Sequence, residues 1–173
     1  MTKNFSTCDL CDAHKADFSG NFRVLAPVFK DFGAVQQFCG PVDTVKCFED
    51  NSLVKAAVDS PGWLETSTGR IAKVLVVDGG GSLRKALVGG NLGAAAARNG
   101  WAGVVIDVCV RDVEELKAAN VGIRALAAMP MPTEKRNEGQ SQIPVQIQGA
   151  WVRPGDWLYA DADGIVVSAH PLS

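Results

Sequence analysis

The chain has 173 residues, of which 47% are hydrophobic and 21% charged, and its formal net charge is −2. These values are typical of a globular protein, and the length predicts one domain over 1–173. The sequence has no basic stripe of the kind that binds nucleic acid and no apolar run near the ~18 residues that span a membrane. The N-terminal segment MTKNFSTCDLCDAHK lacks the apolar core of a secretory signal, and five cysteines do not suit a disulfide framework. We therefore expect reduced thiols and a cytoplasmic protein.

The first part of the chain predicts two helices, two short strands and a loop. Ser6 or Thr7 can cap the first helix, with Leu10 and Ala13 facing inward. Gly40-Pro41 is expected to separate the two strands. In chain order, the predicted segments are a helix over 8–17, strands over 35–38 and 42–48, a helix that carries 53–58 after a cap at Asn51 or Ser52, and a surface loop over 59–69.

The middle of the chain alternates between apolar runs and helical segments. The runs at 74–77, 104–108 and 123–127 are rich in β-branched residues, as expected for buried parallel strands. Short helices are predicted at 83–88 and 113–119, and an alanine-rich helix begins near Gly89 and ends at Asn99-Gly100. Two successive strand–helix–strand passages predict parallel pairing with right-handed crossovers.

The last part of the chain changes to antiparallel β-structure. A polar loop of about twelve residues, 130–141, precedes an alternating strand at 145–148. A turn follows at 153–156. A second turn at 160–164 then separates the two final strands. The whole pattern predicts a mixed α/β protein with β-structure at both ends.

Two motifs in the sequence favour structural interpretations over chemical ones. Cys8, Cys11 and His14 share one face of the first helix, but zinc requires four ligands and no second pair exists, so the cysteines are interpreted as small apolar side chains on the inner face of that helix. The loop 78–82 (DGGGS) could hold an anion or, by a distant likeness to methyltransferase loops, S-adenosylmethionine. It lacks the third glycine of a dinucleotide motif, because Arg84 occupies that position, and a tight turn is the preferred interpretation.

Near the C-terminus, three further polar side chains are interpreted as structural. Asp161 and Asp163 are expected in a hairpin turn with Gly164 at positive φ, and His170 is expected to be solvated.

A third constellation is more informative. Four residues open the alanine-rich helix, where the first N–H groups are free to bind a carboxylate: Gly89, Gly90, Asn91 and Leu92. Arg111-Asp112 follows the strand 104–108, at the sheet edge where ligands bind. Arg111 offers a planar fork to a carboxylate, and Asp112 offers a hard oxygen to Mg²⁺ or Mn²⁺. A cation, an arginine and a helix N-terminus that converge on one crevice would suit a small oxo-acid as ligand. The alternative is that Asp112 only complements a helix dipole and Arg111 only forms a surface ion pair.

Five stretches also carry a family resemblance: 40–51 (GPVDTVKCFEDN), 74–84 (VLVVDGGGSLR), 99–103 (NGWAG), 110–113 (VRDV) and 156–161 (DWLYAD). Through them the sequence resembles the RraA-like family, which contains regulators of ribonuclease E activity and 4-hydroxy-4-methyl-2-oxoglutarate aldolases. The resemblance implies a β/β/α sandwich of the swivelling-domain type, with parallel central strands, and a homotrimeric ring.

The resemblance also assigns roles to the third constellation. In the family's aldolases the positions of Gly89, Gly90, Asn91 and Leu92 hold the substrate carboxylate through backbone N–H groups. The position of Arg111 binds the same pyruvyl unit, and the position of Asp112 ligates the divalent metal. The resemblance thus implies a class II pyruvate aldolase in which Mg²⁺ or Mn²⁺ stabilises the pyruvate enolate, with Arg111 and Asp112 as catalytic residues.

One position departs from the family's aldolases. They carry an acid, then twenty residues, then Arg-Asp, and the acid position is Gly90 here. In the family's aldolases that acid acts through water on the proton at pyruvate C3. Decarboxylation of oxaloacetate needs no base to remove a proton from the substrate, so we expect it to be retained better than aldol cleavage. The alternative hypothesis is a non-catalytic regulator that binds ribonuclease E, and a methyltransferase comes third.

Overall fold

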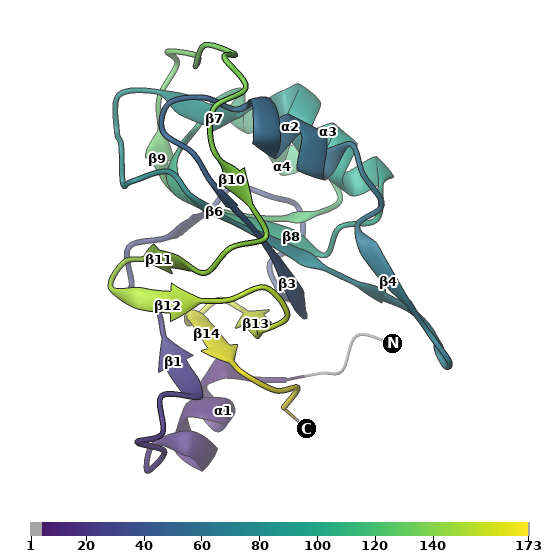
Figure 1. Cartoon of the computed structure of the whole chain (residues 1–173), viewed down its shortest axis with the longest axis vertical. Helices are drawn as coiled ribbons and strands as arrows, with labels where there is room; N and C mark the ends of the chain where they lie inside the picture. Colours follow the sequence, from purple (N-terminus) through teal and green to yellow (C-terminus); the bar gives the residue numbers. More distant parts are fainter. Residues whose placement is uncertain (1–4, 173) are drawn as a thin grey trace.

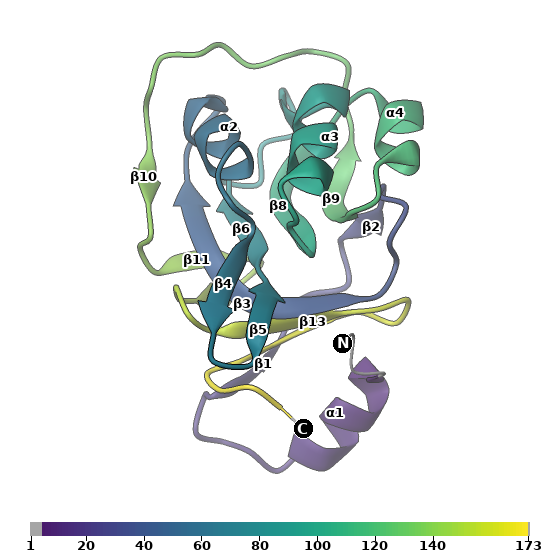
Figure 2. The ribbon, with the colours of Figure 1, turned by 90° about the vertical axis from the view of Figure 1, so that its right-hand side faces the viewer.

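The computed structural model of the protein, shown in Figure 1, describes residues 5–172. Three helices lie together on one side of the central strands, and a second group of β-strands lies on the other side (Figures 1 and 2). The three helices are α2 (Ser52–Val58), α3 (Gly90–Arg98) and α4 (Val113–Ala118). This arrangement confirms the predicted α/β sandwich with parallel central strands. No helix within 5–172 is long and apolar enough to cross a membrane.

The main sheet has the strand order β1-β14-β13-β3-β6-β8-β9-β2. Its strands are β1 (Phe22–Val24), β2 (Lys30–Asp31), β3 (Phe38–Lys46), β6 (Val74–Asp78), β8 (Gly103–Val110), β9 (Gly122–Ala128), β13 (Trp157–Ala160) and β14 (Ile165–Ser168). The four strands β3, β6, β8 and β9 are parallel, and the others pair antiparallel. Two short strands attach to this path: β7 (Ala86–Val88) pairs with β8, and β10 (Gln140–Ser141) pairs with β3.

The remaining elements are two hairpins and the N-terminal helix. They are α1 (Thr7–His14), β4 (Trp63–Thr66) with β5 (Gly69–Ala72), and β11 (Val145–Ile147) with β12 (Ala150–Val152).

The central strands are buried on both faces, which explains their unbroken apolar runs. In β6, Leu75 and Val77 pack in the core beneath the helices. Val74 and Val76 point the other way, into the core shared with the second β-layer. All four side chains are fully buried. The strands predicted at 74–77, 104–108 and 123–127 are therefore confirmed as β6, β8 and β9.

The prediction of two strands separated by Gly40-Pro41 is wrong. A single strand, β3, runs through both residues and changes partner there: 38–41 pairs antiparallel with β13, and 42–46 pairs parallel with β6. Proline cannot donate a ladder hydrogen bond, and a change of partner is a place where a strand tolerates that loss.

Two other element predictions are also corrected. The predicted loop 59–69 contains β4 and the start of β5, an exposed hairpin whose side chains show no apolar alternation. The predicted helix 83–88 is a loop followed by the buried strand β7, because three apolar residues cannot distinguish a helix from a strand.

Some predictions for the two ends of the chain also differ from the structure. Helix α1 is capped by Ser6 and ends at His14, and Ala13 is exposed while Leu10 is buried. Asp161 does accept the N–H groups of its turn, but Gly164 does not have positive φ. His170 is exposed, as predicted.

Candidate active site

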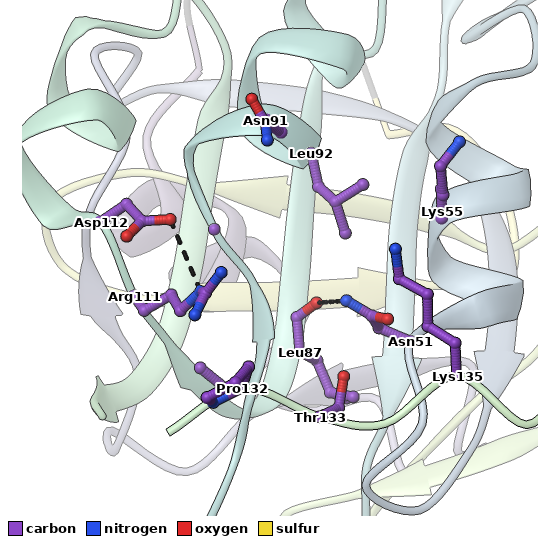
Figure 3. A pocket seen from close by; sticks show the side chains of 12 residues that line it. Asn51, Lys55, Leu87, Asn91, Leu92, Arg111, Asp112, Pro132, Thr133 and Lys135 are labelled. Carbon is purple, nitrogen blue, oxygen red and sulfur yellow. Dashed lines mark hydrogen bonds and ion pairs between the residues drawn. The ribbon is translucent and has the colours of Figure 1, made fainter. Parts of the chain in front are cut away.

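A pocket of about 200 Å³ lies beside the N-terminus of α3, next to the carboxyl ends of β7 and β8 (Figure 3). Of the residues predicted for the site, it is lined by Gly89, Asn91, Leu92, Arg111 and Asp112. Five of the six predicted residues therefore come together at one pocket, and Gly90 is not among those that line it. A pocket of this volume suits a small organic acid, since sites for drug-sized ligands usually exceed ~300 Å³.

The local backbone explains how Arg111 and Asp112 reach the pocket. The Arg111 N–H donates to the carbonyl oxygen of Val88 at 2.9 Å, which ties the end of β8 to β7. Asp112 then adopts a left-handed conformation, with φ 56° and ψ 47°, and turns the chain into α4. Aspartate is among the few residues that tolerate this conformation. The Arg111 and Asp112 side chains are about 40% exposed, at 41% and 39%.

The Asp112 side chain does not cap its own helix. Its Oδ2 accepts the N–H of Gly90 at 3.1 Å, at the start of α3, and lies 3.6 Å from the Arg111 Nε. The carboxylate therefore sits at the positive end of α3 rather than serving as a cap for α4. Its Oδ1 has no hydrogen-bond partner among the described residues.

Gly89 and Gly90 make room for two carboxylates from α4 and the residue before it. A Cβ on Gly89 would lie 2.5 Å from the Asp112 Oδ2. A Cβ on Gly90 would overlap the Glu115 Oε2 and lie 2.6 Å from the Glu115 Cδ. The Glu115 carboxylate thus occupies the space that a side chain at position 90 would fill.

Glu115 was missed by sequence reasoning, although a signal was present. Asp112 and Glu115 are three residues apart at the start of a helix, so both side chains lie on one helix face. That spacing places a second carboxylate beside any site to which Asp112 contributes.

The four N–H groups at the start of α3 are not equally available. Gly90 donates to Asp112, and Leu92 donates to the carbonyl oxygen of Gly89 at 3.1 Å. Within residues 5–172, the N–H groups of Gly89 and Asn91 have no acceptor. These two amides, at the positive end of α3, can bind a carboxylate without breaking an existing hydrogen bond.

The chemistry of the donor set fits a hard divalent cation. Mg²⁺ is usually held by one or two carboxylates and several waters, and Asp112 supplies a partly exposed carboxylate with one free oxygen. The part of the chain that the structure describes contains no group of three or more His, Cys, Asp and Glu residues that could enclose a metal. The residues therefore fit a largely hydrated Mg²⁺ or Mn²⁺ better than a fully enclosed ion.

The opposite wall of the pocket contains residues that sequence reasoning also missed. Asn51, Lys55, Thr133 and Lys135 come from the start of α2 and from the loop after β9 (Figure 3). No local motif links these two segments, which are about eighty residues apart in the sequence.

The N–H groups of the glycine loop after β6 donate hydrogen bonds to acceptors within the protein. Gly80 donates to the Asp78 Oδ1, and Gly81 donates to the carbonyl oxygen of Asp107, both at 3.0 Å. A Cβ on Gly79 would overlap the Val108 side chain. These contacts agree with a tight turn and close backbone packing, and they leave little for an anion to bind.

The cysteines of α1 differ in their environments. Cys11 packs against the small cluster around Leu10 and Tyr159, but Cys8 is exposed, contrary to its predicted place on the inner face. The negative charge of Asp163 raises the pKa of the Cys8 thiol, and burial raises that of Cys11. Raised pKa values disfavour the thiolate that metal binding and redox exchange require.

Together, a β/β/α sandwich with a small carboxylate-and-arginine pocket at the carboxyl edge of its parallel strands defines the class of this protein. The chain belongs to the RraA-like family, whose sequence model, described as Aldolase/RraA, matches residues 7–167.

Two curated relatives carry the same name, "Putative 4-hydroxy-4-methyl-2-oxoglutarate aldolase". The protein from Albidiferax ferrireducens is 76% identical over 172 residues, which cover 99% of each chain. The protein from Cupriavidus taiwanensis is 56% identical over 167 residues, which cover 96% of each chain.

Two solved structures share the fold over nearly the whole chain. The RNA-processing inhibitor RraA from Thermus thermophilis has a TM-score of 0.88 and 41% identity, covering 98% of this chain and 96% of its own. A Geobacillus kaustophilus structure has a TM-score of 0.85 and 38% identity, and covers 97% of each chain. That structure is described as an S-adenosylmethionine: 2-dimethylmenaquinone methyltransferase.

Proposed function

We propose that the protein is a carbon–carbon lyase that releases pyruvate from 4-hydroxy-4-methyl-2-oxoglutarate and similar acids, and that it also decarboxylates oxaloacetate. The observation that carries this proposal is the convergence of Arg111, Asp112 and the free amides of α3 at one small pocket, with the Glu115 carboxylate beside it against Gly90. The names of the close relatives support the same activity.

In this mechanism Arg111 and the α3 amides bind the pyruvyl carboxylate. The guanidinium forms a bidentate pair with it, and the N–H groups of Gly89 and Asn91 bind it from the positive end of the helix. This orients the 2-oxo group toward Asp112, which would hold Mg²⁺ or Mn²⁺. The cation, when bound, supplies Lewis-acid stabilisation of the negative charge that develops on the 2-oxo oxygen.

Glu115 moves protons in the same mechanism. Aldol cleavage requires removal of the proton from the 4-hydroxyl group and return of a proton to C3, whereas decarboxylation requires only the return. The Glu115 carboxylate stands where a side chain at position 90 would lie, and it is exposed enough to act through water. We assign it the proton-handling role that the resemblance gives to an acid at position 90.

Asp112→Asn tests the metal site separately from the fold. Asparagine tolerates the left-handed conformation and its amide oxygen can still accept the Gly90 N–H, so unfolding free energy should change by less than about 1 kcal/mol. Pyruvate release from both substrates should lose its dependence on Mg²⁺ and fall to the background rate. A variant that keeps metal-dependent activity would place the metal elsewhere.

Arg111→Lys tests the carboxylate clamp. A lysine keeps the charge but not the bidentate fork, so both activities should fall together. Steady-state assays of pyruvate release from the two substrates measure this, and a loss confined to one substrate would exclude Arg111 as the shared clamp.

The second candidate is a regulator that binds a ribonuclease of the E type. It is favoured by the likeness to the Thermus structure, which is described as an RNA-processing inhibitor. A docking function does not need the metal ligand. Asp112→Asn would therefore leave inhibition of a purified ribonuclease E unchanged while it removes the lyase activity.

We also propose that the chain assembles as a homotrimer. Phe48, Leu83 and Met131 are large apolar side chains, each more than half exposed. They lie close in sequence to residues that line the pocket, since Phe48 precedes Asn51, Leu83 precedes Ala86 and Met131 precedes Pro132. Light scattering should give three times the mass of the chain, and a monomer at micromolar concentration would contradict the proposal.

A further inference from the structure

The wall of the pocket across from Arg111 and Asp112 is basic. Figure 3 shows Lys55 of α2 and Lys135 of the loop after β9 on this side. Lys55 forms an ion pair with Asp59, one turn further along α2. Lys135 has no ion-pair partner within residues 5–172. The Lys135 ammonium is therefore available to an anion in the pocket.

The acidic neighbours of Lys135 do not neutralise it. Glu134 and Glu138 both pair with Arg136, at 3.3 Å and 3.0 Å. The segment 134–138 has no net charge, but its carboxylates pair with Arg136 and leave the Lys135 ammonium without an ion pair.

Two buried polar atoms without partners lie in the same wall. Only three buried side-chain N or O atoms lack a hydrogen-bond partner in the described chain, and two of them are the Asn51 Oδ1 and the Thr133 Oγ1. An unpaired buried polar atom costs about 1–3 kcal/mol, so natural proteins rarely keep one without a reason. Two such atoms beside an unpaired ammonium indicate that a polar group from outside the chain completes this wall.

The segment that carries Lys135 is held in place at both ends. Met131 accepts the N–H of Ala86 at 2.8 Å, which fixes the segment to β7. At the other end, Asp50 accepts the N–H groups of Ser52 and Arg136, which fixes the segment to the start of α2. These contacts hold Lys135 at the pocket before any ligand binds, which is the preorganisation that a specific site requires.

We propose that Lys135 selects dicarboxylic substrates by binding the carboxylate at the end of the molecule opposite the one bound by Arg111. Asn51 and Thr133 supply the polar floor between the two charges. This inference rests on the proposed function and adds the residue that determines substrate class: a 2-oxo acid with a second carboxylate is bound in preference to pyruvate itself.

The test compares the binding of pyruvate and of 2-oxoglutarate in the presence of Mg²⁺ by calorimetry. 2-Oxoglutarate carries the second carboxylate but has no 4-hydroxyl group, so it cannot be cleaved. The parent protein should prefer 2-oxoglutarate. Lys135→Met should weaken the affinity for 2-oxoglutarate by about tenfold or more, the loss expected for one charged hydrogen bond. The affinity for pyruvate should stay within about threefold of the parent value.

Three further variants make the comparison specific. Lys135→Arg keeps the charge and should restore the preference for 2-oxoglutarate. Lys15→Met makes the same charge change on α1, at the far end of the molecule (Figure 1), and should change neither affinity. Thr133→Val removes the unpaired hydroxyl, so it should weaken the binding of 2-oxoglutarate. The melting temperature of the free protein should stay equal or rise.

The outcomes separate this inference from the proposed function. If the parent shows no preference for 2-oxoglutarate, or if Lys135→Met weakens both acids equally, the assignment of Lys135 is wrong even where pyruvate is released from the aldol substrate. If the preference is present and depends on Lys135 but no substrate is cleaved, the dicarboxylate site stands and the lyase proposal falls.

Discussion

The position of the proton-handling acid can be tested by moving it between two helices. Glu115→Gln keeps the size of the side chain and removes its ability to carry a proton. We expect kcat for aldol cleavage of 4-hydroxy-4-methyl-2-oxoglutarate to fall by roughly 10²–10⁴-fold, the usual contribution of general acid–base catalysis. Oxaloacetate decarboxylation, which needs no proton removed from its substrate, should fall by less than about tenfold.

The reciprocal change shows why the acid cannot occupy both places. In Gly90→Asp the new Cβ would lie 2.6 Å from the Glu115 Cδ and 2.8 Å from its Cβ. The exposed carboxylate can swing away, but the Glu115 Cβ is fixed to α4. We therefore expect overpacking of about 1–3 kcal/mol, or a melting temperature lower by roughly 2–12 °C. Backbone strain adds nothing, because Gly90 is a helical residue without positive φ.

The double variant Gly90→Asp with Glu115→Gly removes the overlap, including the 2.8 Å approach of the two Cβ atoms, and returns an acid to the same space. Its aldol cleavage should recover to within about tenfold of the parent rate, and its melting temperature should exceed that of Gly90→Asp alone. Glu114→Gln is the matched control, since Glu114 lies on the same helix in an exposed pair with Lys117.

The assays are pyruvate release from the two substrates, and exchange of the pyruvate methyl protons with D₂O followed by NMR. An unchanged ratio of aldol cleavage to decarboxylation in Glu115→Gln would refute the assignment. So would a double variant as slow as Glu115→Gln.

Two other predictions concern stability and thiol reactivity. Burial raises the pKa of Asp50, but hydrogen bonds from the N–H groups of Ser52 and Arg136 outweigh the effect of burial and lower this pKa below its usual range. The ionised Asp50 therefore stabilises the fold above about pH 3.9, and this stabilisation is lost as pH falls through the pKa of the folded state. Asp50→Ala should lower the unfolding free energy at pH 7 by about 1–3 kcal/mol and flatten the loss of stability in acid, which calorimetry at several pH values would show; an unchanged melting temperature at pH 7 would contradict it. For Cys8, whose pKa is raised chiefly by Asp163, Asp163→Asn should speed alkylation by iodoacetamide at pH 8, measured by mass spectrometry, and an equal rate would exclude the carboxylate as the cause.

The central strands could be predicted because they are buried on both faces. Strands such as β6 leave an apolar run with no polar interruption, and that pattern survives in any sequence context. The hairpin of β4 and β5 could not be predicted, because its side chains are mostly exposed and carry no alternation. Pro41 misled for a different reason: it is normally a strand breaker, and only the tertiary change of partner in β3 makes it acceptable.

Part of the candidate site could likewise be predicted from the sequence, and part of it could not. Arg111 and Asp112 were found because they follow a strong strand signal, and the start of α3 was found from its Gly-Gly-Asn cap. The basic wall was not found, since Lys135 reaches the pocket only through the contacts of Asp50 with a segment more than eighty residues away. The local sequence pattern predicts the wall formed by Arg111, Asp112 and the start of α3, whereas the wall that contains Lys135 depends on tertiary contacts.

Gly90 and Glu115 show how an apparent loss in the sequence can be a relocation in space. Read along the chain, the glycine removes the acid that the resemblance leads one to expect. In three dimensions the missing side chain is what admits the Glu115 carboxylate, because a Cβ at position 90 and the present position of Glu115 are mutually exclusive. The spacing from Asp112 to Glu115, one turn of helix, keeps both carboxylates on the same side of α4. An acid on α3 and an acid on α4 are therefore alternative ways to place one carboxylate at the same point beside the start of α3.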